Sequence, residues 1–231
     1  MGKIIGIGGG FGGQDALELA RYIIRLSGKE YPNVLHIPTA GYDFADGSTI
    51  SMFARLGCDV DVLYVTHAYM TEELVAKQIR NADVIQVSGG NLKFLMDKWK
   101  KSNAVKYLKE AFDEGKVLFG TSSGSMCWFR EGYDDCGPEG DFMFVDCLNF
   151  IPYVNVPHYE GKNWQTFNSV ASTRKESAIC IENDAAISFI DGKCELIIAG
   201  DSPDARVWFF DAEDGYKRYD LTQHPEIVAR L

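Results

Sequence analysis

Short apolar runs alternate with amphipathic stretches along the first half of the chain, and this alternation limits the available folds more than any other sequence feature. Strand–helix alternation of this kind predicts a parallel, doubly wound α/β sheet with helices on both faces. The expected strands cover residues 3–8, 33–37, 60–65, 83–87 and 117–119. The expected helices cover about 14–26, 46–57, a stretch opened by Thr71, 91–100 and 102–115.

The pattern changes after about residue 130, where short strands predominate. Asp191-Gly192 and Asp214-Gly215 have the composition of hairpin turns. Since no linker or repeat divides the chain, we expect residues 1–231 to form a single domain whose C-terminal part adds antiparallel strands to the sheet edge. The strands expected here are 142–148, 151–156, 178–182, 186–190, 193–199 and 206–210, with a helix over about 163–172.

Composition excludes several classes of protein. The 231 residues are 46% hydrophobic, which is enough for a sizeable core. A net charge of −10 without a Lys/Arg cluster argues against nucleic-acid partners. No apolar run is long enough to span a bilayer, and the N-terminus lacks a signal peptide. The six cysteines are scattered without a C-x-x-C motif, so we expect reduced thiols, no metal site and a cytoplasmic location.

Three glycine-rich turns follow expected strands, at residues 8–13, 88–91 and 120–124. Ligands of doubly wound sheets bind beyond the carboxyl ends of the strands. We therefore expect all three turns to line one crevice.

The third of these turns, Gly120-Thr121-Ser122-Ser123-Gly124, matches the G-x-S-x-G nucleophile elbow. Ser122 is then a candidate nucleophile, and the backbone N–H of Ser123 is a candidate oxyanion donor. The alternative is a Gly/Ser-rich loop without chemistry. Gly89 and Gly90 offer a second backbone donor, which is compatible with a helix start capped by Asn91.

A nucleophilic serine needs a base, and His158 is the candidate among four histidines. It ends the extended run 153–158, where Pro157 fixes the preceding backbone. His36 lies mid-strand, where a structural role is expected; His67 follows the third strand without an assigned role, and His224 is in the C-terminal tail. Sequence spacing does not decide which acid would orient the base. The candidates are Asp134, Asp135, Glu182 and Asp184.

With these residues assembled, the chain resembles the peptidase E family of serine peptidases, which includes aspartyl dipeptidases and cyanophycinases. That family has a flavodoxin-like fold similar to class I glutamine amidotransferases. The resemblance implies Ser122 as nucleophile and His158 as base, with an oxyanion hole from Gly89 or Gly90 and Ser123. It also implies Asp135 or Glu182 as the third member, with Glu182 preferred because a strand end holds it rigidly. The motifs that carry the likeness are Ile37-Pro38-Thr39-Ala40, Ser88-Gly89-Gly90-Asn91, Gly120-Thr121-Ser122-Ser123-Gly124-Ser125 and Val156-Pro157-His158.

The chain departs from the family in two places. Ser123 stands where a smaller residue, often Ala, follows the nucleophile. Aspartyl dipeptidases carry an arginine-rich stretch after the histidine, whereas residues 159–165 here contain only Lys162 as a cation, and the nearest arginine is Arg174. Lysine binds a carboxylate less well than arginine does. Asn91 and Lys162 are the candidate substrate-binding side chains, and a preference for aspartate is not expected.

The resulting prediction is a serine peptidase that hydrolyses dipeptides or short peptides without metal or cofactor. One alternative is a non-catalytic relative that binds a peptide or an amino acid. Another is a nucleotide-binding module, because Gly8, Gly10 and Gly13 satisfy G-x-G-x-x-G, although the second strand lacks the acid that such sites need. A glutaminase would need a cysteine at position 122. Antiparallel edge strands would also allow a homodimer.

Overall fold

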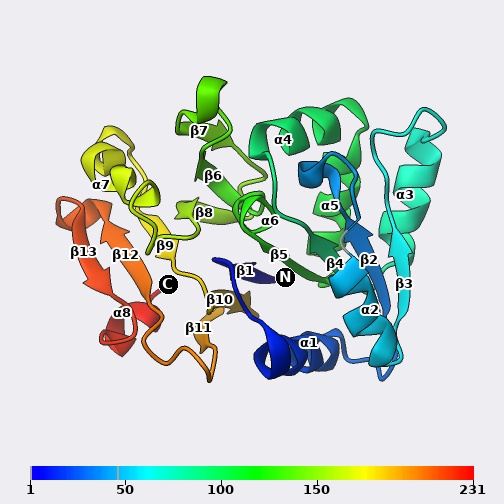
Figure 1. Cartoon of the computed structure of the whole chain (residues 1–231), viewed down its shortest axis with the longest axis horizontal. Helices are drawn as coiled ribbons and strands as arrows, with labels where there is room; N and C mark the ends of the chain where they lie inside the picture. The colour runs from blue at the N-terminus through cyan, green and yellow to red at the C-terminus, as the bar shows by residue number, and fades with distance from the viewer. Residues whose placement is uncertain (1, 46) are drawn as a thin grey trace.

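The computed structural model describes residues 2–45 and 47–231 and divides the strands between two sheets (Figure 1). The first sheet contains β1 (Lys3–Ile7), β2 (Asn33–Ile37), β3 (Asp59–Val62), β4 (Val84–Val87), β5 (Val117–Thr121), β10 (Ala185–Ile190) and β11 (Lys193–Ile198). Their order is β11-β10-β1-β5-β4-β2-β3. The five neighbouring strands β1, β5, β4, β2 and β3 are parallel. The hairpin of β10 and β11 adds two antiparallel strands beside β1.

Helices cover both faces of the first sheet, with α1 (Gly13–Ser27) and α2 (Gly47–Arg55) on one face and α3 (Glu72–Asn81), α4 (Leu92–Lys101) and α5 (Ala104–Asp113) on the other. Neighbouring strand residues point to opposite faces: Phe119 packs with α1 and α2, whereas Leu118 packs with the other three helices. Burial on both faces explains the continuous apolar runs of the central strands β1, β4 and β5. The predicted doubly wound α/β sheet is confirmed.

The second sheet is mixed and comes from the C-terminal half. It contains β6 (Phe129–Asp134), β7 (Met143–Asp146), β8 (Ile151–Val156), β9 (Ala178–Ile181), β12 (Val207–Asp211) and β13 (Lys217–Asp220), in the order β13-β12-β9-β8-β6-β7. One of its faces, with Ile179 and Phe209, shares a core with the first sheet. On the other face, Val154 and Cys180 pack against Phe167 in the single turn of α7 (Phe167–Val170).

The structure corrects several details of the expected second half. Only β10 and β11 extend the edge of the first sheet, and the other C-terminal strands form the separate second sheet. The helix expected over 163–172 is a series of short 3₁₀ and α turns. Strand β6 was not expected, because Glu131, Gly132 and Asp134 interrupt its apolar pattern.

Two short helices complete the fold, α6 (Ser123–Met126) and α8 (Pro225–Val228). The helix expected over 46–57 corresponds to α2, and its first residue, Asp46, lies outside the described residues. In the described part of the chain, none of the helices has both the length and the apolar character needed to cross a membrane.

Candidate active site

Ser122 lies at a sharp turn between β5 and α6. Its φ of 58° and ψ of −123° lie outside the regions that L-residues normally occupy. The surrounding backbone holds this conformation: Ser122 N–H donates to Ile7 O at 3.1 Å, and Ser122 O accepts from Ser125 N at 2.8 Å and Met126 N at 3.0 Å. Strained backbone of this kind persists where the structure over-determines it, which is frequent at functional sites.

The turn is possible because α6 presses directly against the end of β4. A Cβ atom on Gly124 would lie 2.1 Å from Val87 O, closer than any side chain can approach. The second glycine of the G-x-S-x-G motif is therefore required by packing. It lets the helix start behind Ser122 without displacing the neighbouring strand.

The candidate oxyanion residues lie near Ser122. A Cβ atom on Gly89 would lie 3.5 Å from Ser122 Oγ, so this residue borders the hydroxyl. Within residues 2–45 and 47–231, the N–H groups of Gly89, Gly90 and Ser123 donate to no backbone carbonyl. Ser123 Oγ donates to Gly90 O at 2.8 Å, which links the two backbone segments. The three expected oxyanion residues thus lie together beside Ser122.

Helix α4 begins directly after this glycine pair. Asn91 Oδ1 accepts from Phe94 N at 2.8 Å, so the Asn91 side chain caps the helix. The Asp134 carboxylate at the end of β6 accepts from Leu92 N at 3.0 Å. Burial raises the pKa of Asp134 to about 6. A carboxyl group of the second sheet therefore helps to fix the Gly89-Gly90 turn of the first.

His158 follows β8 and lies against the loop after β1. Its Nδ1 lies 2.7 Å from Asn183 Oδ1. Because an amide oxygen only accepts, Nδ1 carries the proton and Nε2 is left as an acceptor. Trp164 packs on the ring at a centroid distance of 5.2 Å. A Cβ atom on Gly9 would lie 2.6 Å from His158 Cε1, so this position has room only for glycine.

The two acids expected to orient His158 lie elsewhere. Glu182 accepts from Trp208 Nε1 at 2.8 Å and from Arg206 N at 2.9 Å. Asp135 is exposed just beyond the end of β6. His158 Nδ1–H donates instead to Asn183 Oδ1. Sequence reasoning misses Asn183 because it considers only acids. The signal was its place after β9, next to Glu182, together with the Cys-His-Asn arrangement of other peptidases.

The end of β1 brings the serine and the histidine to one edge of the first sheet. Ile7 O accepts from the Ser122 amide, and Gly9, two residues later, contacts the His158 ring. No hydrogen bond joins the Ser122 hydroxyl to His158 among the residues that the structure describes. The arrangement is a serine, a histidine with a free acceptor nitrogen, and unpaired backbone donors.

Comparison with known proteins identifies the family of this chain. The family model "Peptidase family S51" matches residues 4–197. The chain belongs to peptidase family S51. The uncharacterized peptidase YgaJ of Bacillus subtilis is 32% identical over 166 residues, 70% of each chain. A protein named peptidase E from Shewanella denitrificans is 27% identical over 161 residues, 69% of this chain and 67% of that protein.

Solved structures agree on the fold. A peptidase from an acI-B1 actinobacterium superposes with a TM-score of 0.72 at 19% identity, covering 96% of this chain and 94% of that one. A putative peptidase E from Listeria monocytogenes gives a TM-score of 0.66 at 18% identity, covering 87% and 100%. The expected resemblance to peptidase E proteins is confirmed, and the S51 chain is a serine-type peptidase.

The arginine nearest to His158 in sequence, Arg174, is engaged by other side chains in this S51 peptidase. Arg174 Nε donates to Glu131 at 2.8 Å, and Arg174 Cζ lies 4.6 Å from the Phe144 ring centroid. The Arg174 side chain therefore packs against strands of the second sheet. Lys162 is exposed in the loop after His158. A guanidinium clamp for a substrate carboxylate is therefore not formed by Arg174.

The G-x-G-x-x-G turn has a structural partner of its own. Asp184 accepts from Phe11 N at 2.6 Å and from Ser202 Oγ at 2.8 Å. The Asp184 carboxylate accepts from a backbone N–H of this turn that a bound phosphate would need, and its negative charge repels a phosphate. This contact argues against the nucleotide-binding alternative.

The cysteines have the environment of structural thiols. Cys127 is fully buried, which raises its thiol pKa well above the ordinary value. Burial likewise raises the pKa of Cys136 to about 12. Within the described ranges, 2–45 and 47–231, no cluster of three His, Cys, Asp or Glu side chains could hold a metal ion.

Proposed function

We propose that this S51 peptidase hydrolyses dipeptides or short peptides through Ser122, His158 and Asn183. The observation that carries the proposal is the hydrogen bond of 2.7 Å between His158 Nδ1 and Asn183 Oδ1, next to the strained turn of Ser122. Ser122 Oγ attacks the peptide carbonyl carbon, and His158 Nε2 accepts the proton. His158 then gives this proton to the departing amine, and water hydrolyses the acyl-enzyme by the same steps in reverse.

Asn183 orients the base without adding charge. By accepting from Nδ1–H, it keeps Nε2 free of a proton and available to act as the base. A neutral amide stabilises the imidazolium less than a carboxylate does. The pH dependence of catalysis then differs from that of a Ser-His-Asp enzyme, which offers a way to test the assignment.

The amides of Ser123 and of Gly89 or Gly90 are the proposed oxyanion donors. Gly89 borders the Ser122 hydroxyl and Ser123 follows it in sequence, and the N–H groups of Gly89, Gly90 and Ser123 donate to no backbone carbonyl within residues 2–45 and 47–231. One such donor is typically worth ~3 kcal/mol of transition-state stabilisation. The bond from Ser123 Oγ to Gly90 O holds the two donor segments in register.

Three further features of the sequence prediction stay proposals. The core that joins both sheets supports one domain over residues 1–231. Strands β3, β11, β7 and β13 end the two sheets, and their outer edges would allow a homodimer. A cytoplasmic location also stays a prediction.

Hydrolysis of a dipeptide library by the wild type, Ser122→Ala and His158→Ala tests the proposal. We expect cleavage by the wild type, and a loss of at least about 10³-fold in kcat for each variant with unchanged thermal stability. Cleavage that persists in Ser122→Ala would contradict the proposal. Saturable peptide binding without cleavage by the wild type would favour the non-catalytic alternative.

A further inference from the structure

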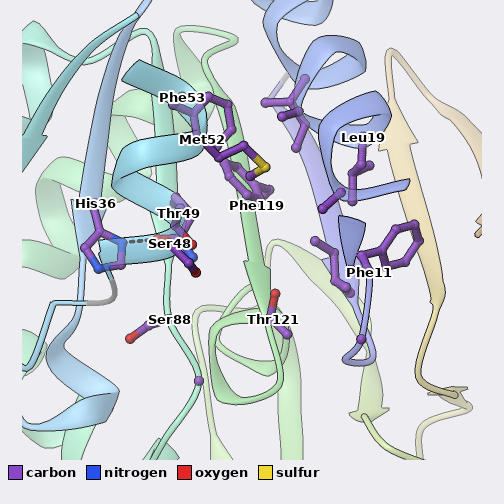
Figure 2. Close-up of a pocket in the computed structure, with 18 of the residues that line it drawn as sticks. Phe11, Leu19, His36, Ser48, Thr49, Met52, Phe53, Ser88, Phe119 and Thr121 are labelled. Atoms are coloured by element: carbon purple, nitrogen blue, oxygen red, sulfur yellow. Dashed lines mark hydrogen bonds between the residues drawn. The ribbon is translucent and has the colours of Figure 1, made fainter. Parts of the chain in front are cut away.

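A cavity of about 560 Å³ lies between the first sheet and helices α1 and α2 (Figure 2). Its walls include the buried side of α1, with Ala16, Leu19 and Ala20, and the α2 residues Met52 and Phe53. Phe119 of β5 forms part of the sheet-side wall. Cavities of about 300–1,000 Å³ are the size that proteins use for small ligands.

The cavity adjoins the candidate active site. Gly89 and Thr121 line it, and these residues border Ser122 in space and in sequence, respectively. The glycine-rich turns after β1, β4 and β5 all contribute to the lining, which confirms their expected convergence. Phe11 and the 83%-exposed Phe44 also line it and mark the side that faces solvent. A peptide bonded to Ser122 would therefore have a neighbouring side chain beside this cavity.

The lining is apolar with a small polar part. Phe11, Phe53 and Phe119 supply aromatic surface, and Figure 2 shows Met52 near Phe119. The polar part includes His36, whose Nδ1 is hydrogen-bonded to Gln86 Oε1. None of the described lining residues is a lysine, arginine, aspartate or glutamate.

The described lining disfavours charged side chains. Moving a carboxylate or an ammonium group out of water without an opposite charge is costly, and the described lining residues include no carboxylate, lysine or arginine to compensate it. Apolar side chains gain from leaving water, in proportion to the area buried. Ser88 Oγ, a buried hydroxyl without a hydrogen-bond partner among the described residues, can bond a neutral polar group such as a phenol.

Resting on the proposed peptidase function, we propose that this cavity binds a large uncharged side chain of the substrate, aromatic or long aliphatic, next to the bond that Ser122 attacks. The enzyme then prefers phenylalanine, tyrosine or leucine at one position flanking the scissile bond. It discriminates against aspartate and lysine at that position.

The first test uses two dipeptide panels, X-Ala and Ala-X, with X as Phe, Tyr, Leu, Ala, Asp or Lys. We expect kcat/KM for Phe, Tyr or Leu to exceed that for Ala, Asp and Lys by about 10- to 100-fold in one panel. A preference for Asp or Lys, or equal rates for all X in both panels, would overturn the proposal while leaving the peptidase assignment intact.

A binding measurement separates this proposal from the proposed catalysis. Calorimetry with the Ser122→Ala variant compares Phe-Ala and Ala-Phe with Asp-Ala and Ala-Asp. Tighter binding of a phenylalanine peptide by about 10-fold or more supports the cavity assignment even where the wild type cuts no peptide. Equal or weaker binding of both phenylalanine peptides contradicts it.

A cavity-filling substitution provides the residue-level test. Ala16→Phe places a ring in the cavity from the middle of its α1 wall, and Ala16→Leu is a smaller version that is easier to accommodate. We expect both variants to lower kcat/KM more for Phe peptides than for Ala peptides, and Ala16→Phe to have the larger effect. The matched control Ala54→Phe, on the exposed side of α2, is expected to keep the wild-type preference. An unchanged preference in both Ala16 variants would contradict the proposal.

Discussion

The first sheet supplies Ser122 and the oxyanion amides through backbone geometry, whereas the second sheet supplies His158 and Asn183 through side-chain contacts. In the first, the turn is fixed by neighbouring strands, such as the bond from the Ser122 amide to Ile7 O. In the second, His158 is held by the side-chain amide of Asn183 and by the ring of Trp164. A backbone site tolerates few substitutions at its glycines, while a side-chain site can be retuned by changing one residue.

The largest effect is expected where the backbone geometry is broken. Gly124→Ala places a Cβ 2.1 Å from Val87 O, so α6 must shift away from β4. We expect loss of activity and a fall of about 2–4 kcal/mol in the free energy of unfolding, measured by urea denaturation. The matched control is Gly47→Ala at the start of α2, where a Cβ has no neighbour within 4 Å. Equal stability of the two variants would contradict the packing argument.

The side-chain contacts that hold His158 are tested at Asn183. Asn183→Ala removes the acceptor for His158 Nδ1–H, and we expect kcat/KM to fall by about 10²-fold. Asn183→Asp keeps an acceptor and adds a charge that favours the imidazolium, so the acid limb of the pH–rate profile is expected to move to higher pH.

Asp135→Asn is the comparison variant for that experiment. Asp135 is exposed beyond β6, and we expect its substitution to change kcat/KM by less than about 3-fold. A larger loss in Asp135→Asn than in Asn183→Ala would identify Asp135 as the partner of His158 and overturn the assignment.

Asp134 connects the two sheets, and its effect depends on pH. Burial raises its pKa to about 6, above the ordinary value of about 4. Between these pH values the native state keeps a proton that the unfolded state has lost, so stability falls as pH rises. Asparagine does not titrate, so the Asp134→Asn variant does not lose this stability as the pH rises. We expect the variant to gain about 2 kcal/mol relative to wild type between pH 4 and pH 7, measured by urea denaturation across that range. A difference that stays constant with pH would contradict the raised pKa.

Among the substitutions within the proposed site, the smallest effect is expected at Ser123. Ser123→Ala removes the bond to Gly90 O and leaves the amides in place. We expect kcat to fall by about 3- to 10-fold, at a stability cost of about 1 kcal/mol. A single hydrogen-bond loss that abolished activity would show that the oxyanion turn depends on Ser123 alone.

Sequence reasoning reached the first sheet because its signals are local. Strands β1, β4 and β5 are apolar runs followed by glycine-rich turns, and Gly120 to Gly124 identify the elbow within one stretch. The second sheet depends on long-range pairing, so β6, with Glu131 and Asp134 buried among its neighbours, has no local strand pattern.

The partner of His158 is also a long-range property. Glu182 and Asn183 are adjacent in sequence, and spacing does not reveal which one faces the histidine. The structure separates them because Trp208 and Arg206 draw the Glu182 carboxylate toward β12, while Asn183 stays in the turn near Gly9.

The central claim is that Ser122 is activated by His158, and covalent labelling tests it most directly. Intact-protein mass is measured after incubation with a fluorophosphonate for the wild type, Ser122→Ala, His158→Ala and Ser123→Ala. We predict one adduct on the wild type and on Ser123→Ala, and none on Ser122→Ala or His158→Ala. An adduct that survives in Ser122→Ala, or a folded wild type that remains unlabelled, would contradict the account.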